Sequence, residues 1–276
     1  MERATARLFD AMAADYERLE PWYEHLYAVL HPLLVAELTP PRDERSRRSL
    51  DAGCGTGFQT ALLEDLGYAS HGVDLAPRLL AQARQRLDRS ALALASLEAL
   101  PYRDHSFDVV VCCGSTLSFV AHPQAALREL GRVLRPRGRL LLECEHRGSL
   151  DLGWGLVSAL TGDSLGYGLS LAAAWRQLTY RPRQSCTVDY PSYGRLRLFA
   201  RGELRAMLEA AGLRPLRWWG IHVLTNLIPS TVLHRERLGR LTAALFRRLR
   251  ALDARLATFP PAQRAANSLV VLAEKG

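Results

Sequence analysis

Three glycines at alternate positions follow an acidic residue in the segment Asp51-Ala52-Gly53-Cys54-Gly55-Thr56-Gly57. Glycine lets the backbone turn tightly and approach a ligand without a Cβ atom in the way. A helix that begins after such a turn offers unpaired N–H groups to that ligand. A second acid, Asp74, ends the next apolar segment, where its carboxylate can accept hydrogen bonds from a ribose diol. The pattern predicts a nucleotide-binding site.

The glycine spacing separates two kinds of nucleotide ligand. A dinucleotide fingerprint places its third glycine three residues after its second, whereas here Gly57 stands two residues after Gly55. The leading acid, Asp51, would repel a pyrophosphate, and it suits a ligand that carries a sulfonium or ammonium charge.

Residues 51–57 resemble motif I of the class I S-adenosylmethionine-dependent methyltransferases. Ala99-Leu100-Pro101-Tyr102 resembles the segment that flanks the adenine in that family, and residues 107–111 resemble its fourth strand. Residues 125–142 are similar to the helix, turn and fifth strand of the subgroup that includes the ubiquinone and menaquinone biosynthesis methyltransferases.

The resemblance covers residues 45–145 well and 200–275 loosely. It implies S-adenosyl-L-methionine as the cofactor, S-adenosyl-L-homocysteine as the product, and a Rossmann-like α/β fold. The cofactor-binding residues it implies are Asp51, Gly53, Cys54, Gly55, Gly57, Asp74, Leu75, Ser96, Leu97, Glu98 and Cys113.

Two positions depart from the family pattern. Relatives often carry an acid that contacts the adenine amino group where this chain has Ser96, so either Ser96 or the backbone around Leu97 would make that contact. Relatives often place a histidine at the position of Phe119. If the acceptor must lose a proton, this chain would use another base, and the nearby His122 is expected at the surface.

Methyl transfer mainly requires in-line positioning and the exclusion of water, and a base helps when the acceptor must lose a proton. Candidates for the acceptor pocket are Tyr16, Ser115, Glu143, Glu145 and His146, with His25 and His222 as further candidate bases. Alternation along a strand puts Glu143 and Glu145 on one face and Cys144 on the other. Such a carboxylate pair suits a cationic acceptor, and ion pairs with arginines are the alternative. No residue is assigned as the catalyst.

The elements that position these residues alternate between strands and helices. Strands are predicted near 48–52, 70–74, 91–95, 107–113, 138–145, 218–223 and 267–273, and helices near 57–66, 76–88, 123–134 and 201–213. This order predicts a mostly parallel, seven-stranded sheet with helices on both faces. Because ligands bind at the carboxyl ends of parallel strands, the candidate residues should converge on one edge.

Segments outside this alternation are expected to form a lid and a substrate cap. Residues 1–45 are predicted as an N-terminal helical lid that ends near Pro40-Pro41. Residues 46–146 and 200–276 form the core. The insertions 147–199 and 224–264 form the cap, with a hairpin around Pro191-Ser192-Tyr193-Gly194 and an Arg-rich helix pair over 231–258.

Composition narrows the class of protein. The net charge is +8, but of the 36 basic residues only Lys275 is a lysine, and the basic clusters lack interleaved aromatic residues. The composition therefore argues against nucleic acid as a partner. The five cysteines show no C-x-x-C spacing, and no metal site is predicted. No apolar run is long enough to span a membrane, so a cytoplasmic protein is expected, with weak peripheral membrane contact through 231–258 as an open possibility.

The function predicted from these observations is methyl transfer to a small-molecule acceptor, aromatic, quinone-like or amine. The alternatives are an RNA or protein methyltransferase and a non-catalytic S-adenosylmethionine-binding protein. The first alternative is disfavoured because Cys113-Gly114-Ser115-Thr116 stands where an N-P-P-[YF] tetrapeptide would be expected. The sequence leaves the acceptor atom and the oligomeric state open.

Overall fold

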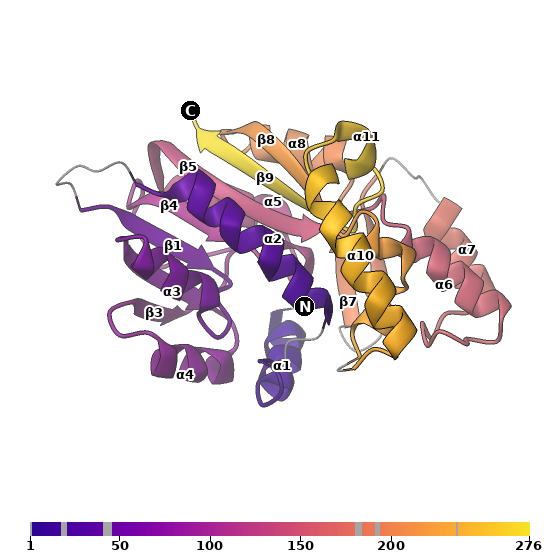
Figure 1. Ribbon diagram of the computed structural model, residues 1–276. Helices are drawn as coiled ribbons and strands as arrows, with labels where there is room; N and C mark the ends of the chain where they lie inside the picture. Colours follow the sequence, from indigo (N-terminus) through magenta and orange to yellow (C-terminus); the bar gives the residue numbers. More distant parts are fainter. Residues whose placement is uncertain (1, 18–20, 41–45, 180–183, 191–193, 236) are drawn as a thin grey trace.

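The computed structural model describes residues 2–17, 21–40, 46–179, 184–190, 194–235 and 237–276 (Figure 1). Its strands are β1 (Arg48–Ala52), β2 (Ala69–Asp74), β3 (Ala91–Leu94), β4 (Phe107–Cys112), β5 (Leu134–Glu145), β6 (Cys186–Tyr190), β7 (Gly194–Leu198), β8 (Leu213–Ile221) and β9 (Ser268–Lys275). Its α-helices are α1 (Glu2–Met12), α2 (Pro21–Leu38), α3 (Phe58–Asp65), α4 (Pro77–Arg86), α5 (Pro123–Val133), α6 (Asp151–Leu160), α7 (Leu171–Thr179), α8 (Arg201–Glu209), α9 (Ser230–Leu233), α10 (Arg240–Leu256) and α11 (Pro260–Gln263). Two 3₁₀ turns are η1 (Thr116–Phe119) and η2 (Thr225–Leu227).

Seven of the strands form one sheet in the order β3-β2-β1-β4-β5-β9-β8. Neighbours from β3 to β5 are parallel, and β9 runs antiparallel to both β5 and β8. The predicted α/β fold with a mostly parallel seven-stranded sheet is confirmed. The hairpin β6–β7 forms a separate two-stranded sheet.

Helices cover both faces of the sheet, because successive strand residues alternate between two cores. On one face, Val110 and Leu142 pack with Leu127 of α5 and Leu204 of α8. On the other face, α2 contributes its leucine stripe to a core that also contains residues of α3, and the end of α10 packs there too. Figure 1 shows α2 lying across this second face and α10 beside it, past the end of β5.

Several elements differ from the sequence-based prediction. β8 begins at Leu213 instead of near 218, because it pairs with β9 along its whole length, from Leu213 opposite Lys275 onward. This part of β8 is largely exposed and carries polar residues, so its hydrophobic pattern is weak. β5 likewise begins at Leu134, earlier than predicted.

The inserted segments hold more helix than the sequence indicated. Residues 147–199 contain α6 and α7 before the predicted hairpin, and 231–258 contain the end of the single turn α9 and one long helix, α10, instead of a pair of comparable helices. Two predicted features, the hairpin turn at 191–193 and the end of the lid at Pro41, lie outside the described residues. Among the described helices, none combines the length and apolar character needed to cross a membrane.

Candidate functional site

The turns that follow β1, β2, β3 and β4 meet at one edge of the sheet, as the strand order predicted. They surround a cavity of about 640 Å³, which we call the loop cavity. Its lining residues are Glu2, Thr5, Ala6, Phe9, Tyr16, Gly53, Gly55, Asp74, Leu75, Ala76, Leu79, Ser96, Leu97, Gly114, Thr116, Phe119 and Val120.

The glycine loop is bound to the end of β2. The backbone N–H groups of Gly53 and Cys54 both donate to the carbonyl of Val73, at 2.7 and 3.0 Å. Gly53 and Gly55 have positive φ angles of +84° and +51°, a region in which side chains with a Cβ are strained. The loop therefore exposes backbone toward the cavity.

Asp74 holds this loop from the second strand. One carboxylate oxygen accepts the N–H of Gly55 at 2.8 Å, and the other accepts the N–H of Ala76 at 2.8 Å. Burial raises the pKa of Asp74, and the backbone hydrogen bonds oppose that shift. The carboxylate lines the cavity at the junction of the loop and α4.

Five of the predicted cofactor-binding residues lie behind the cavity lining: Asp51, Cys54, Gly57, Glu98 and Cys113. Asp51 is 1% exposed and accepts the Thr60 hydroxyl at 2.6 Å. Burial raises the pKa of Asp51 to about 7. The other predicted cofactor-binding residues do line the cavity: Gly53, Gly55, Asp74, Leu75, Ser96 and Leu97.

At the β3 end of the loop cavity, the first turn of α1 meets the sheet. The Ser96 hydroxyl donates a short hydrogen bond to the Glu2 carboxylate and accepts the N–H of Glu98 at 3.0 Å. Both Glu2 and Ser96 line the cavity. Sequence reasoning missed Glu2, which is 94 residues from Ser96.

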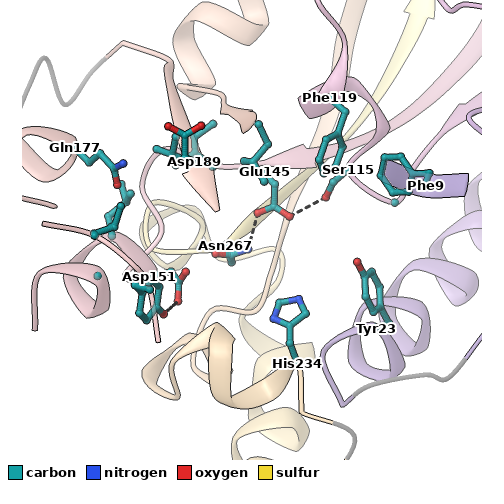
Figure 2. A pocket seen from close by; sticks show the side chains of 18 of the residues that line it. Phe9, Tyr23, Ser115, Phe119, Glu145, Asp151, Gln177, Asp189, His234 and Asn267 are labelled. Atoms are coloured by element: carbon teal, nitrogen blue, oxygen red, sulfur yellow. Dashed lines mark hydrogen bonds between the residues drawn. The ribbon is translucent and has the colours of Figure 1, made fainter. Parts of the chain in front are cut away.

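A second cavity, of about 870 Å³, lies beside the first and reaches under the hairpin β6–β7; we call it the hairpin cavity (Figure 2). Its lining residues are Phe9, Tyr16, Tyr23, Gly114, Ser115, Phe119, Glu145, Asp151, Leu152, Gly155, Tyr167, Leu169, Gln177, Val188, Asp189, Leu196, Leu198, His234 and Asn267. Phe9, Tyr16, Gly114 and Phe119 line both cavities. The rings of Phe9 and Phe119 pack edge to face with their centroids 5.1 Å apart.

A carboxylate from the end of β5 projects into the hairpin cavity. Glu145 accepts the Ser115 hydroxyl at 2.8 Å and the Asn267 side-chain amide at 2.7 Å (Figure 2). The neighbouring carboxylate on the same strand face, Glu143, accepts the N–H of Ser115 at 2.6 Å. Burial raises the pKa of both glutamates, and their mutual repulsion raises that of Glu145 further. Neither glutamate has an ion pair with an arginine among the described residues.

The described lining of the hairpin cavity contains neither arginine nor lysine. The polar groups of the lining include the carboxyl groups of Glu145 and Asp189, the latter paired with Arg195 at 3.4 Å, and aromatic and aliphatic side chains form most of the remainder. The third carboxylate of the lining, Asp151, already accepts hydrogen bonds from the hydroxyls of Tyr167 and Ser230. An anionic ligand would therefore find no arginine or lysine to pair with in the described lining.

Other candidate residues have structural partners away from the cavities. His146 is buried and hydrogen-bonds the carbonyl of Ala266 at 3.0 Å, and burial lowers its pKa to about 4. The rings of His25 and His222 lie 4.8 Å apart, and His25 is bonded to Asp253 at 3.1 Å. None of these three histidines lines the loop cavity or the hairpin cavity. His122 is exposed at the start of α5, as expected.

Residues that sequence reasoning missed enter the hairpin cavity from distant elements. They include Phe9, Tyr23, His234 and Asn267 (Figure 2). His234 Nδ1 lies 2.7 Å from the Ser230 carbonyl, so in the neutral ring this nitrogen carries the proton and Nε2 is the acceptor. Burial lowers the pKa of His234, which favours this neutral form. No local motif marks these four residues. Within the described residues, no group of His, Cys, Asp and Glu is arranged to hold a metal ion.

Comparison with known proteins identifies the domain that surrounds the loop cavity. A family profile described as "Methyltransferase domain" matches residues 50–142. These residues include the glycine loop, Asp74 and Ser96. The chain carries a methyltransferase domain of the S-adenosylmethionine-dependent family.

Relatives of the methyltransferase domain match about half of this chain. Over 144 residues the chain is 38% identical to the malonyl-[acyl-carrier protein] O-methyltransferase of Halorhodospira halophila, covering 50% of this chain and 47% of that protein. The chain spans about half the length of the curated relatives it matches.

Solved structures resemble the methyltransferase domain together with its insertions. A chain of the Haloferax volcanii complex between the Trm112 methyltransferase activator and the putative methyltransferase matches with a TM-score of 0.60 and 17% identity, covering 98% of this chain and 96% of that one. The Burkholderia thailandensis 1,6-didemethyltoxoflavin-N1-methyltransferase, solved with bound 1,6-didemethyltoxoflavin and S-adenosylhomocysteine, matches with a TM-score of 0.50 and 18% identity, covering 89% of this chain and 76% of that one. At these identities the similarity shows the fold alone.

Proposed function

We propose that this chain transfers a methyl group from S-adenosylmethionine to a small-molecule acceptor that is aromatic, quinone-like or an amine. The observation that carries the proposal is a pair of cavities that share one wall. Because Phe9, Tyr16, Gly114 and Phe119 line both, a donor in the loop cavity and an acceptor in the hairpin cavity would meet there.

The strand order at this edge supports one orientation of S-adenosylmethionine along the carboxyl ends of the strands. Ser96 follows β3, Asp74 ends β2, and the glycine loop follows β1. Gly114 follows β4, so these groups span three strand spacings, or roughly 14 Å, which suits an extended nucleoside joined to an amino acid. With the ribose at Asp74, the base lies toward β3 and the sulfur toward β4, beside the hairpin cavity.

The residues of the loop cavity fit this ligand. A Cβ atom at Gly55 would lie 3.6 Å from the Tyr16 ring, so the glycine leaves open the space between loop and ring. The Asp74 oxygens have further lone pairs for the ribose hydroxyls, while Leu75 and Leu97 offer apolar contacts to the base. Of the five predicted residues behind the lining, Asp51, Cys54 and Gly57 would support the loop from its own segment. When bound, S-adenosylmethionine supplies a methyl group on a positively charged sulfur, and the acceptor atom forms its bond to that methyl as the sulfur–methyl bond breaks.

The lack of arginine and lysine in the described lining of the hairpin cavity supports a neutral or amine acceptor. A malonyl group, which the names of the curated relatives give as their acceptor, carries a carboxylate. Here such a group would meet Glu145, with no arginine or lysine in the described lining. Tyr16, Ser115 and Glu145 are the predicted acceptor-pocket residues that line the cavity. Glu143 does not line it, but its carboxylate accepts the N–H of Ser115.

We also propose that the predicted lid and cap enclose the acceptor. The hairpin cavity takes lining residues from 1–45, from 147–199 and from 224–264, in addition to core residues such as Glu145 and Asn267. A wall assembled from several inserted segments beside the core is suited to selecting an acceptor while excluding water.

Calorimetry with S-adenosylmethionine and S-adenosylhomocysteine tests the cofactor. We expect micromolar binding to the wild type, a loss of about 1–3 kcal/mol in Asp74→Ala because a hydrogen bond to a charged group is removed, and no loss in Asp88→Ala, which changes an exposed aspartate of the same half of the fold. Absence of heat and of any thermal shift with both ligands would overturn the proposal.

Release of S-adenosylhomocysteine then tests the acceptor. Aromatic amines, phenols and quinols are offered in one set, and a malonyl thioester, RNA and protein in another. Turnover confined to the first set supports the proposal. Turnover with the malonyl thioester or a macromolecule would contradict the acceptor class, and tight binding without turnover in any set would indicate a binding protein.

A further inference from the structure

Helix α1 forms one side of the loop cavity. Glu2, Thr5, Ala6 and Phe9 line it, one turn of the helix after another. None of the described residues of α1 is fully buried, so its core packing is slight. Its position depends on the partly buried Phe9 and Met12 and on polar contacts, among them the hydrogen bond from the Ser96 hydroxyl to Glu2.

The hydrogen-bond pattern at Ser96 determines the direction of that contact. Ser96 has one hydroxyl proton, which it donates to Glu2, while its oxygen accepts the N–H of Glu98. The Glu2 carboxylate accepts hydrogen bonds and donates none. One of its oxygens is engaged by Ser96, and the group has lone pairs left for a donor inside the cavity.

The surroundings of Glu2 suit a flat ring that carries an amino group. Leu75, Leu79, Leu97 and Val120 give the same cavity an apolar lining. The described lining includes no arginine or lysine to pair with the carboxylate. A carboxylate that only accepts hydrogen bonds, beside an apolar surface, favours a flat ring whose edge donates hydrogen bonds. Adenine has such an edge, because its exocyclic amino group is a donor.

We infer that Glu2 recognises the amino group of the adenine ring and so makes α1 part of the purine-binding site, with Ser96 as the residue that positions the Glu2 carboxylate. The inference rests on the proposed function, which places the base toward β3. It also links the two cavities, because Phe9 on the same helix lines both of them. Contacts from α4 hold the last turn of α1 and the residue after it in place: the Arg78 N–H donates to Asp10 at 2.9 Å, and the Gln82 amide donates to the Ala13 carbonyl at 2.7 Å.

The test compares two ligands that differ at one position of the purine. S-adenosylhomocysteine carries the amino group, and S-inosylhomocysteine carries a carbonyl oxygen in its place. Binding of each is measured by calorimetry for the wild type, Glu2→Ala, Glu2→Gln and Ser96→Ala. Glu17→Gln is the matched control, because Glu17 belongs to the same N-terminal segment, pairs with Arg86 at 2.7 Å and lies outside the loop-cavity lining.

We expect the wild type and Glu17→Gln to prefer the adenosyl ligand by roughly tenfold or more, the usual effect of a hydrogen bond to a charged group. Glu2→Ala should bring the two affinities to within about twofold, chiefly by weakening the adenosyl ligand. Glu2→Gln should favour the inosyl ligand, because its amide can donate to the carbonyl oxygen. Ser96→Ala should reduce the preference in part.

Two results would overturn the inference, and they differ from failure of the proposed function. If Glu2→Ala weakens both ligands by the same factor, Glu2 only fastens α1 to the sheet. If the wild type binds both ligands equally, the amino group is not recognised. If the wild type binds neither ligand, the proposed function fails and this assignment fails with it. Thermal unfolding of each variant confirms that it is folded before titration.

Discussion

Gly53 occupies a position that only a residue without a side chain can take. Its φ of +84° is unfavourable for other residues, and a Cβ atom there would lie 2.3 Å from Cγ2 of Thr116. Thr116 is itself held by a hydrogen bond from its hydroxyl to the Cys113 carbonyl at 2.8 Å. The first turn after β1 is therefore in direct contact with the turn after β4, which places both at the loop cavity.

Substitution of this glycine tests that contact. Gly53→Ala should lower the free energy of unfolding by roughly 2–3 kcal/mol, because it adds a steric clash to the strain of a positive φ. Gly67→Ala is the control, since Gly67 has a φ of +92° with nothing within 4 Å of its Cβ position. It should lose only about 1 kcal/mol. Urea unfolding measures both; equal losses would show that Thr116 moves aside freely.

At the scale of elements, the pairing of β5 with β9 assembles the acidic side of the hairpin cavity. Strand alternation puts Glu143 and Glu145 on one face, whereas Cys144 packs into the core on the other. The antiparallel register sets Glu145 opposite Ser268. Asn267, the residue before β9, thereby reaches Glu145 and donates its amide proton.

The pH dependence of stability tests the raised pKa of Glu145. Because the folded protein holds this proton more tightly than the unfolded chain, wild-type stability should fall as pH rises from the ordinary carboxyl value of 4.5 through the raised pKa. Glu145→Gln cannot lose that proton. The free energy of unfolding of this variant should therefore rise relative to that of the wild type across this pH interval, by roughly 1–3 kcal/mol at the upper end of the interval.

Urea unfolding of the ligand-free protein between pH 5 and pH 8.5 would measure this difference, with the exposed Glu209→Gln as the control. A constant difference between Glu145→Gln and the wild type over that range would contradict the raised pKa.

At the scale of the whole molecule, one buried carboxylate joins segments from both ends of the chain. Asp253 of α10 accepts hydrogen bonds from the Leu224 N–H and the Thr225 hydroxyl, and it contacts His25 of α2 at 3.1 Å. Burial alone would raise the pKa of Asp253, but hydrogen bonds from His25, Thr225 and Leu224 outweigh it and lower the pKa. This cluster holds α2 and α10 together over one face of the sheet.

Asp253→Asn should destabilise the protein by about 3 kcal/mol at pH 7, because it removes the charge that these buried donors face. A lowered pKa contributes stability that is present above the unfolded value of 3.8 and is lost as pH falls through the folded value. The deficit should accordingly shrink below about pH 4. Thermal unfolding at pH 7 and below about pH 4 measures this loss of stability, with Asp88→Asn as the control. A loss that is the same at the two pH values would contradict the lowered pKa of Asp253.

Much of the core could be predicted from the sequence because its rules are local. The glycine spacing around Gly53, the acid at Asp74 and the alternation of strands with helices each depend on neighbouring residues. The convergence of these groups at one sheet edge follows from the parallel strand order, and the structure confirms it. The start of β8 at Leu213 escaped prediction because an exposed strand with polar residues has little hydrophobic period.

The sequence by itself determined the α/β fold, the methyltransferase domain and the residues at the ends of β1 and β2. Only the tertiary structure decided that Glu2 meets Ser96, that Asn267 meets Glu145, and that Tyr23 and His234 face the same cavity. Each of these contacts joins residues far apart in the chain, through an N-terminal helix, an insertion or the last strand. How such segments pack depends on the shapes of surfaces that form only on folding, and no local residue pattern encodes that.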